Sequence, residues 1–420
     1  MDQNPYSEFR PILSSPFEEP QQHYLIKKGE VVQVVEGRRP PLAYQPRLNS
    51  KHWDDIPDVL EFCPDYSTHD GSSTPKRGKN KEEDGTRAYE LKLVSRIRTR
   101  LKEWKAQGYP GASRTTVELL DYWSRPGRKR RLFFAQREAA ETIIFLHEAR
   151  ADFLQGLTIP LDEPSEKRKE LGFSAFPRYA AKMATGSGKT TVMAMLIAWS
   201  VLNKVARHQR PHYTDQVVIV CPNVTIRDRL NELLPSLGEQ SLYRKRDLIP
   251  ESQLASLNRA KILITNWHIF EVQSVQGSAG AKVDKRGERR ETVETVQITA
   301  KQNKRGRLMT PQAFDALEAS GEIEVLNREM DAKGNLVSAT IKTVRYVESE
   351  ASWAARVLDQ NGLTHQNVLV INDEAHHAYR LKLDEENDAT ERDDEDWSEF
   401  SREATVWVED GLDVINKRRK

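Results

Sequence analysis

The chain has 420 residues, long enough for two or three domains with cores of their own, and its 64 Lys and Arg residues nearly balance its 63 Asp and Glu residues. A formal net charge of +1 gives no indication of a nucleic-acid partner, and the two cysteines, Cys63 and Cys221, exclude a disulfide framework and fit a reducing compartment. Because the N-terminus has no signal-peptide pattern and no stretch approaches about 18 uninterrupted apolar residues, we expect a cytoplasmic protein that makes no membrane contact.

Residues 1–125 are predicted to form an N-terminal accessory region. Its first half is rich in proline and aromatic residues and contains two short extended pieces, over 23–26 and 31–35. Over 67–87 nearly every residue is polar, charged, Gly or Pro. Such a stretch buries too little apolar area to offset its ordering entropy, so we predict a disordered loop there.

Two helices are predicted next. Apolar residues recur at helical spacing from Leu91 to Trp104, and Gly108 and Pro110 end the pattern. A second, shorter helix is predicted over 115–123.

Glu90 and Lys92 match the E-x-K half of a nuclease site, in which acids and a lysine hold Mg²⁺ and activate water. The match is short, and both residues lie in the helical pattern with no clear strand before them. We therefore interpret them as part of a solvated helix face.

A long helix-like run begins near Gln136, directly after Phe133 and Phe134, and extends through Phe153. A polar connection over 161–169 follows. The first strand of the motor lobe is predicted near 175–183.

The stretch over 181–191 has the composition of a phosphate-binding loop. Gly186 and Gly188 allow the backbone to curl so that N–H groups point inward, Lys189 can reach terminal phosphates, and Thr190 offers a hydroxyl to Mg²⁺. The apolar, proline-free run that follows predicts a buried helix whose positive end faces the phosphates. We therefore predict that ATP and Mg²⁺ bind here rather than that the glycines form an empty turn. The residues predicted to bind the nucleotide are Thr185, Gly186, Ser187, Gly188, Lys189, Thr190 and Thr191.

Two continuous apolar runs, over 217–220 and 261–264, predict strands buried in a parallel sheet. Hydroxyl, amide and arginine groups follow each run, and these groups can bind the sugar-phosphate backbone without reading sequence. The candidate nucleic-acid contacts are Pro222, Asn223, Thr225 and Arg227 after the first run and Thr265 and Asn266 after the second. An ordinary strand-to-helix turn with a solvated basic face explains the first group equally well. Trp267 is interpreted as a core residue.

Residues 271–350 exceed what a single motor lobe needs and are predicted to be an inserted α+β module. A helix is predicted over 311–319. A hairpin is predicted from 322–328 and 336–344, with its turn over 331–334.

A last apolar run over 368–371 predicts a strand that delivers Asp373, Glu374 and His376 to the carboxyl edge of the sheet, where ligands bind. Asp373 is predicted to hold Mg²⁺ together with Thr190, and Glu374 to orient the attacking water. His376 is predicted to report the nucleotide state through a hydrogen bond. The acidic residues over 384–396 are predicted to be a solvated loop.

The loop over 184–190 resembles the motif I form AxTGxGKT of superfamily 2 helicases, and Asp373-Glu374-Ala375-His376 is similar to their DEAH box. The runs over 132–139, 264–268 and 11–20 narrow the resemblance to the motor subunit of type III restriction enzymes. It implies an α/β fold over 126–420: a RecA-like P-loop NTPase lobe with a mostly parallel sheet and helices on both faces.

The resemblance further implies an ATP-driven translocase on double-stranded DNA that works with a methyltransferase subunit and carries a C-terminal nuclease. It places Gln136 at the Q motif, where the amide would bind the adenine edge, although Gln136 could instead simply cap a helix. It places the two groups of candidate nucleic-acid contacts at motifs Ia and Ib.

Residues 406–413 look like the approach to motif III, and no Ser-Ala-Thr follows before Lys420. We therefore expect this chain to lack the second lobe, its arginine finger and the nuclease, and to be weak or inactive as a motor. The alternatives are a helicase-family translocase without a nuclease, and a module that binds DNA or a protein partner and keeps a vestigial nucleotide pocket.

Overall fold

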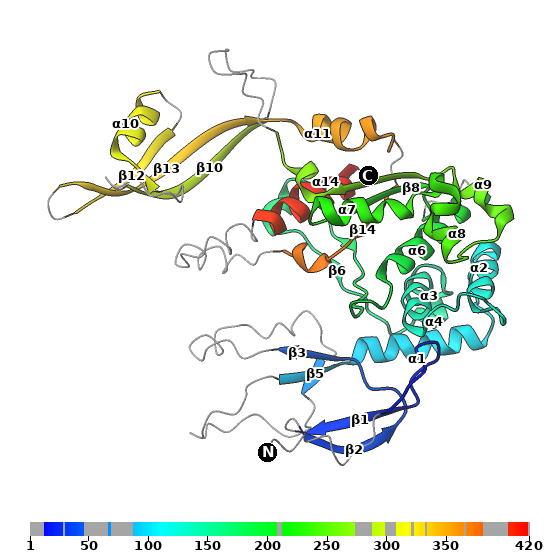
Figure 1. Ribbon diagram of the computed structural model, residues 1–420. Helices are drawn as coiled ribbons and strands as arrows, with labels where there is room; N and C mark the ends of the chain where they lie inside the picture. The colour runs from blue at the N-terminus through cyan, green and yellow to red at the C-terminus, as the bar shows by residue number, and fades with distance from the viewer. Residues whose placement is uncertain are drawn as a thin grey trace. The chain divides into compact units, whose positions relative to one another are not determined.

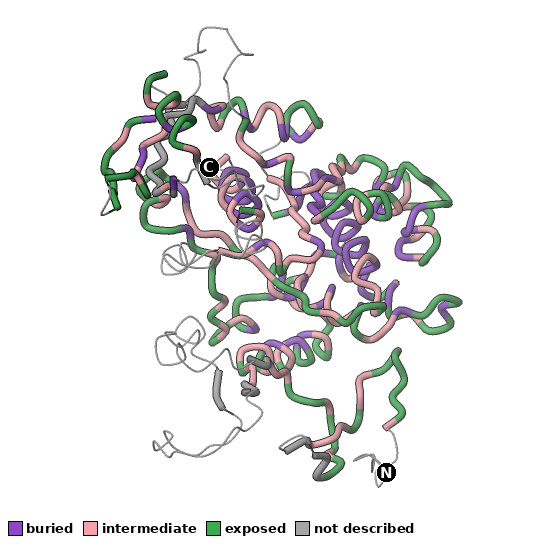
Figure 2. Tube along the Cα trace, turned by 60° about the vertical axis from the view of Figure 1, so that its left-hand side comes forward, coloured by how far each residue is buried: buried purple, intermediate pink, exposed green. Residues whose placement is uncertain are grey.

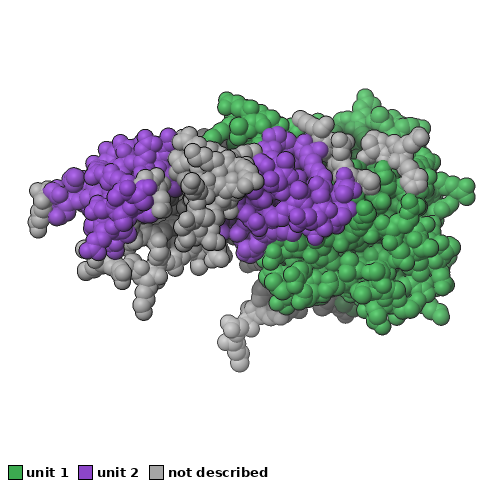
Figure 3. All heavy atoms as spheres, turned by 90° about the horizontal axis from the view of Figure 1, so that it is seen from above, with its two compact units in different colours: residues 1–266, 365–377, 419–420 green, residues 267–364, 378–418 purple. Residues whose placement is uncertain are grey.

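The structure is a computed structural model of the chain. It describes residues 12–27, 30–45, 66–68, 87–207, 212–273, 288–298, 308–320, 323–331, 334–364, 367–380 and 402–418. The chain divides into two compact units (Figure 3). Unit 1 comprises residues 1–266, 365–377 and 419–420, and unit 2 comprises residues 267–364 and 378–418. Within the described residues, no helix has both the length and the apolar character that crossing a membrane requires.

The N-terminal part of unit 1 contains two small antiparallel sheets (Figure 1). β1 (Gln22–Lys27) pairs with β2 (Glu30–Glu36), which confirms the two predicted extended pieces. β5 (Arg87–Leu91) lies between β3 (Leu42–Gln45) and β4 (Tyr66–Thr68).

The disordered loop predicted over 67–87 is wrong at both ends, because Ser67 and Thr68 belong to β4 and Arg87 belongs to β5. Backbone pairing holds these ends, and side-chain composition does not report it. Residues 69–86 lie outside the described residues.

Several helices of unit 1 follow: α1 (Lys92–Ala106), α2 (Arg114–Ser124), α3 (Phe134–Glu148) and α4 (Ala151–Leu154). The first two confirm the helices predicted in this part of the chain. Because α1 begins at Lys92, Glu90 lies on β5, and the interpretation of these two residues as one helix face is wrong. Pairing with β3 and β4 keeps the backbone at Glu90 extended, whereas the apolar spacing reports only the helix that begins after it.

α3 ends at Glu148, so the prediction of one helix through Phe153 is also wrong. Ala149 is extended (φ −60°, ψ 143°), and the Arg150 amide donates to the Pro110 carbonyl at 3.1 Å. Gly111 packs against this break, and a Cβ there would lie 2.6 Å from the Glu148 carbonyl oxygen. A contact with the loop after α1 therefore accompanies the end of the helix, and periodicity within one segment cannot reveal such a contact.

Between α4 and the phosphate loop, β6 (Leu161–Asp162) pairs antiparallel with β7 (Phe176–Pro177), and α5 (Glu166–Glu170) lies between them in the chain. The strand predicted over 175–183 is wrong beyond Pro177, because residues 178–188 form no strand. Arg178 donates to Asp162 at 2.8 Å, and residues 180–182 are exposed. This segment lacks the apolar run that a buried parallel strand requires.

A three-stranded parallel sheet in the order β14-β8-β9 forms the centre of unit 1. All six residues of β8 (Gln216–Cys221) are buried, as its apolar run predicts. It is flanked by β14 (Leu369–Asn372) and β9 (Lys261–Asn266). The burial predicted for the run over 261–264 is wrong, because β9 has only one neighbour in the described sheet and these residues are exposed or half-buried.

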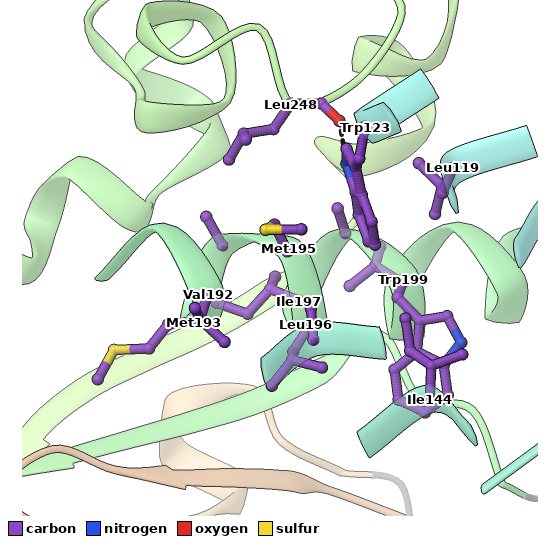
Figure 4. Close-up of a cluster of buried hydrophobic side chains, with 14 of the residues drawn as sticks. Leu119, Trp123, Ile144, Val192, Met193, Met195, Leu196, Ile197, Trp199 and Leu248 are labelled. Carbon is purple, nitrogen blue, oxygen red and sulfur yellow. Dashed lines mark hydrogen bonds between the residues drawn. The ribbon is translucent and has the colours of Figure 1, made fainter. Parts of the chain in front are cut away.

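The 18-residue helix α6 (Lys189–Ala206) joins this sheet to α2 and α3 in one hydrophobic core. Figure 4 shows Met195 and Trp199 of α6 in this core with Leu119 and Trp123 of α2 and Ile144 of α3. Most of α6 is buried, whereas residues 184–186 of the loop before it are exposed. Figure 2 shows the buried residues of the chain in purple. The remaining short helices of unit 1 are α7 (Val224–Leu230), η1 (Asn231–Leu233), η2 (Pro235–Gln240), α8 (Leu242–Lys245), η3 (Glu251–Gln253), α9 (Leu254–Leu257) and η6 (Ala375–His377).

Unit 2 contains a four-stranded sheet in the order β11-β10-β13-β12. Its strands are β10 (Glu288–Ile298), β11 (Leu308–Met309), β12 (Ile323–Met330) and β13 (Leu336–Val347). β12 and β13 form an antiparallel pair, and α10 (Pro311–Ala319) buries Phe314 in the core of the sheet, so both the helix and the hairpin predicted here are present.

The other helices that the structure describes in unit 2 are η4 (Trp267–Phe270), α11 (Glu350–Val357), η5 (Asp359–Asn361), η7 (Val406–Asp413) and α14 (Val414–Arg418). Trp353 donates its indole N–H to the Phe270 carbonyl at 3.0 Å. The acidic residues over 384–396 lie outside the described residues.

Candidate nucleotide site

The phosphate loop has the backbone that its glycines predict. Gly186 has φ +78° and Gly188 has φ +88°, both in the left-handed region that other residues adopt only with strain. Gly188 is the N-cap of α6, so the helix begins at Lys189. The positive end of an 18-residue helix therefore opens directly behind the loop, a geometry that favours a bound anion.

Gln136 is hydrogen-bonded to the phosphate loop. Its Oε1 accepts from the Phe133 amide at 2.9 Å, and its Nε2 donates to the Ser187 carbonyl at 3.0 Å. The side chain is 7% exposed and lies so close to Gly188 that a Cβ there would be 2.0 Å from Nε2. Gln136 thus caps α3, as one of its two interpretations requires, and it also contacts the phosphate loop. Its contact with adenine stays a prediction.

Asp373 and Glu374 lie at the carboxyl end of the parallel sheet, directly after β14. The Asp373 amide donates to the Val220 carbonyl of β8 at 2.8 Å, which fixes the turn against the central strand. Glu374 has φ +50°, a strained conformation for a residue with a side chain. The Lys189 Nζ lies 3.6 Å from Glu374 Oε1, and His376 Nδ1 lies 3.5 Å from Glu374 Oε2. The two segments predicted to share one site therefore do meet.

The Asp373 carboxyl group is 4% exposed, and this burial raises its pKa. The negative charge of Glu374 raises the pKa further, while a hydrogen bond from the Glu374 amide and the charge of Lys189 act in the opposite direction. A buried carboxylate beside another carboxylate is poorly compensated, so a cation placed between them would be favoured.

The oxygen donors of this site fit Mg²⁺. Asp373 and Thr190 supply a carboxylate and a hydroxyl, which are ligands that Mg²⁺ prefers, and this ion usually completes its shell with phosphate oxygens and water. The described residues contain no cluster of three or more His, Cys, Asp and Glu side chains that could hold a metal ion without other ligands. Mg²⁺ at this site would therefore depend on phosphate oxygens and water for the rest of its shell.

The other predicted nucleotide contacts differ in exposure. Thr185 is exposed and Ser187 and Thr190 are half-buried, so they remain candidates. Thr191 is 4% exposed and counts among the buried residues of α6.

The candidate nucleic-acid contacts lie at the carboxyl ends of the adjacent strands β8 and β9: Pro222 and Asn223 follow β8, Thr225 and Arg227 lie in α7, and Thr265 and Asn266 are the last two residues of β9. Asn223 caps α7 by accepting from the Ile226 amide at 2.9 Å, and Arg227 lies 3.1 Å from Asp228. Pro222 and Asn266 are half-buried and Thr225 is exposed. Thr265 is 8% exposed, and its hydroxyl lies 3.3 Å from the Asn266 carbonyl.

Cys221 links these two segments, a role that no sequence motif indicated. Its Sγ donates to the Thr265 carbonyl at 3.2 Å and lies 3.4 Å from the Asn223 carbonyl. Burial, with a smaller effect of Asp373, raises the pKa of the thiol to about 11. The thiol is therefore a neutral contact between the two segments.

Trp267, in unit 2, is 6% exposed and stacks on His268 with ring centroids 3.8 Å apart. The core interpretation of this residue is confirmed.

A protein-family model described as "Type III restriction enzyme, res subunit" matches residues 131–392, more than half of the chain. The matched span includes Gln136, the phosphate loop and residues 373–376. No curated protein and no solved structure matches the chain.

Proposed function

We propose that this chain, which belongs to the family of type III restriction enzyme res subunits, binds and hydrolyses Mg²⁺-ATP in its superfamily 2 helicase-like motor domain to move along double-stranded DNA. One observation carries the proposal: Lys189 at the start of α6 meets Glu374 at the end of β14, beside two left-handed glycines and the buried Asp373. A structural ion pair would not require a glycine turn or a buried second carboxylate.

The proposal gives each group a role. Lys189 would leave Glu374 and neutralise the terminal phosphates, and Thr190 and Asp373 would hold Mg²⁺ between them. The ion would supply a positive charge against which the phosphate chain is polarised. Glu374, released from Lys189, would orient the attacking water, and His376 would report that change to the candidate nucleic-acid contacts.

The DNA and restriction parts of the proposal rest on the family. The segments over 222–227 and 265–266 offer an amide, a hydroxyl and a guanidinium near the same sheet edge, which suits contact with a phosphate backbone. We propose that a methyltransferase subunit supplies the sequence recognition. Phage defence would be the resulting role.

Titration of the purified chain with ATP, with and without Mg²⁺, tests the nucleotide site. We expect binding that Mg²⁺ strengthens and that Lys189→Ala weakens about 10- to 100-fold, the effect of losing a hydrogen bond to a charged group. Lys182→Ala is the matched control, because Lys182 is an exposed lysine of the same segment. Absence of binding at millimolar ATP would favour a vestigial pocket instead.

Hydrolysis is measured separately, with and without a short DNA duplex. We expect DNA to raise the rate and Lys189→Ala to abolish the stimulated activity. A rate that DNA does not change would contradict the proposed movement along DNA while leaving the assignment of the nucleotide site intact.

A further inference from the structure

We infer that the N-terminal segment over 16–19 positions the phosphate loop, and that Phe17 is the positioning residue through which it acts. The inference rests on the proposed function, because the loop is taken to bind a nucleotide. The segment itself precedes the span that the family model matches.

The segment over 16–19 is bonded to the first turn of α3. The Pro16 carbonyl accepts from the Phe134 amide at 2.8 Å, which satisfies one of the N–H groups that the start of a helix leaves without an intrahelical partner. The Phe17 carbonyl accepts from the Arg137 guanidinium at 2.9 Å. Glu19 forms an ion pair with Lys102 of α1 at 2.9 Å. Three separate contacts thus fix this N-terminal segment to α1 and α3.

The Phe17 ring packs against the N-cap of α3. Its centroid lies 5.5 Å from that of Phe133, and the Arg131 guanidinium lies 4.4 Å from the Phe17 centroid. Ring and cation contacts of this kind each contribute about 0.5–1 kcal/mol at partly exposed positions. Phe17 therefore packs directly against Phe133, the N-cap residue of α3.

Phe133 in turn orients Gln136. The Phe133 amide donates to Gln136 Oε1, which leaves Nε2 directed at the Ser187 carbonyl. A glutamine amide has one acceptor and one donor end, so the bond to Phe133 decides which end meets the loop. Because Gly188 leaves no room for a Cβ beside Nε2, a shift of Gln136 would act directly on the backbone that cradles the phosphates.

The contacts form one continuous series, from Phe17 through Phe133 and Gln136 to Ser187. Energetic coupling along this series is tested by changing two of its members, Phe17 and Gln136. Leu13 provides a matched control because it is an apolar residue of the same N-terminal stretch that is 94% exposed.

We expect Phe17→Ala to raise the dissociation constant for Mg²⁺-ATP about fivefold to tenfold and Leu13→Ala to leave it unchanged. Phe17→Tyr, which keeps the ring, should restore the affinity. Hydrogen exchange without nucleotide gives a second measurement: amides over 185–188 should exchange faster in Phe17→Ala, whereas those of the buried part of α6 should not. Faster exchange throughout α6 would mean general destabilisation and would overturn the positioning role.

A double-mutant cycle with Gln136→Ala completes the test. If Phe17 acts through Gln136, the double variant should bind no more weakly than Gln136→Ala alone. Additive losses would overturn the inference and leave the nucleotide site intact. Failure of the unaltered chain to bind nucleotide would instead refute the proposed function itself, and with it this inference.

Discussion

Two carboxylates are buried near the two ends of α6, and their surroundings differ. Glu148 is 9% exposed and accepts hydrogen bonds from the Ser113 amide at 2.7 Å, from the Thr116 hydroxyl at 2.7 Å and from the Trp199 indole. Asp373 is 4% exposed, and its burial and its neighbour Glu374 both raise its pKa.

The two environments indicate different roles, a structural one for Glu148 and a ligand-binding one for Asp373. Three donors replace the water that Glu148 loses, so this carboxylate connects α2, α3 and α6. Asp373 keeps an unfavourable environment that a bound cation would relieve. The strained backbone of Glu374, at φ +50°, lies directly after Asp373. We therefore expect variants near Glu148 to change stability and variants near Asp373 to change ligand binding and chemistry.

The largest effect is expected from Glu374→Gln. Loss of the carboxylate that orients water should lower the rate of ATP hydrolysis about 10³-fold, while nucleotide binding is retained. Rates are to be measured under the conditions in which the unaltered chain is most active. A variant that hydrolyses ATP normally would remove Glu374 from the proposed chemistry.

Glu148→Ala should destabilise unit 1 by about 3 kcal/mol, because it leaves three buried donors without their acceptor at about 1 kcal/mol each. Urea unfolding followed by tryptophan fluorescence measures this loss. Glu118→Ala is the control: Glu118 of α2 pairs with Arg114 on the surface, and its loss should change stability by less than about 0.5 kcal/mol. Equal losses in the two variants would contradict the role given to Glu148.

Gly188→Ala should destabilise the fold by about 1–2 kcal/mol and weaken nucleotide binding, because it combines a strained φ of +88° with a clash against Gln136. Gly108→Ala shares the strain, at φ +76°, but its Cβ would meet nothing within 4 Å. The excess loss in Gly188→Ala therefore measures the contact with Gln136. If the two variants behave alike, Gln136 does not constrain the loop.

The smallest change in stability is expected from Asp373→Asn, which should stabilise the protein by about 0.5–1 kcal/mol at neutral pH. The same variant should abolish the strengthening of ATP binding by Mg²⁺. A raised pKa means that the folded protein disfavours the charged form of Asp373. The advantage of the variant should thus be present above the raised pKa and should vanish as the pH falls below the ordinary value of 3.8. Denaturation midpoints of both proteins across this range test the sign, and an unchanging advantage would refute it.

Local patterns predicted the elements that carry the site. The apolar run before Cys221 correctly indicated a buried parallel strand, because such a strand is covered on both faces and its sequence shows it. The runs over 261–264 and 368–371 indicated parallel strands as well, but those strands are only partly buried. The glycines of the phosphate loop likewise indicated left-handed backbone. The failures at Glu90 and Ala149 share one cause: each depends on a partner elsewhere in the chain, respectively a strand ladder and a loop against a helix end.

By itself, the sequence determined which groups are available for phosphate and metal chemistry and on which kinds of element they lie, since helix and strand periods and glycine conformations are local properties. Only the tertiary structure decided that Lys189 meets Glu374, that Gln136 holds the Ser187 carbonyl, and that Phe17 packs on Phe133. These contacts join residues distant in the chain, and their geometry follows from how α3, α6 and β14 pack, which no single segment encodes.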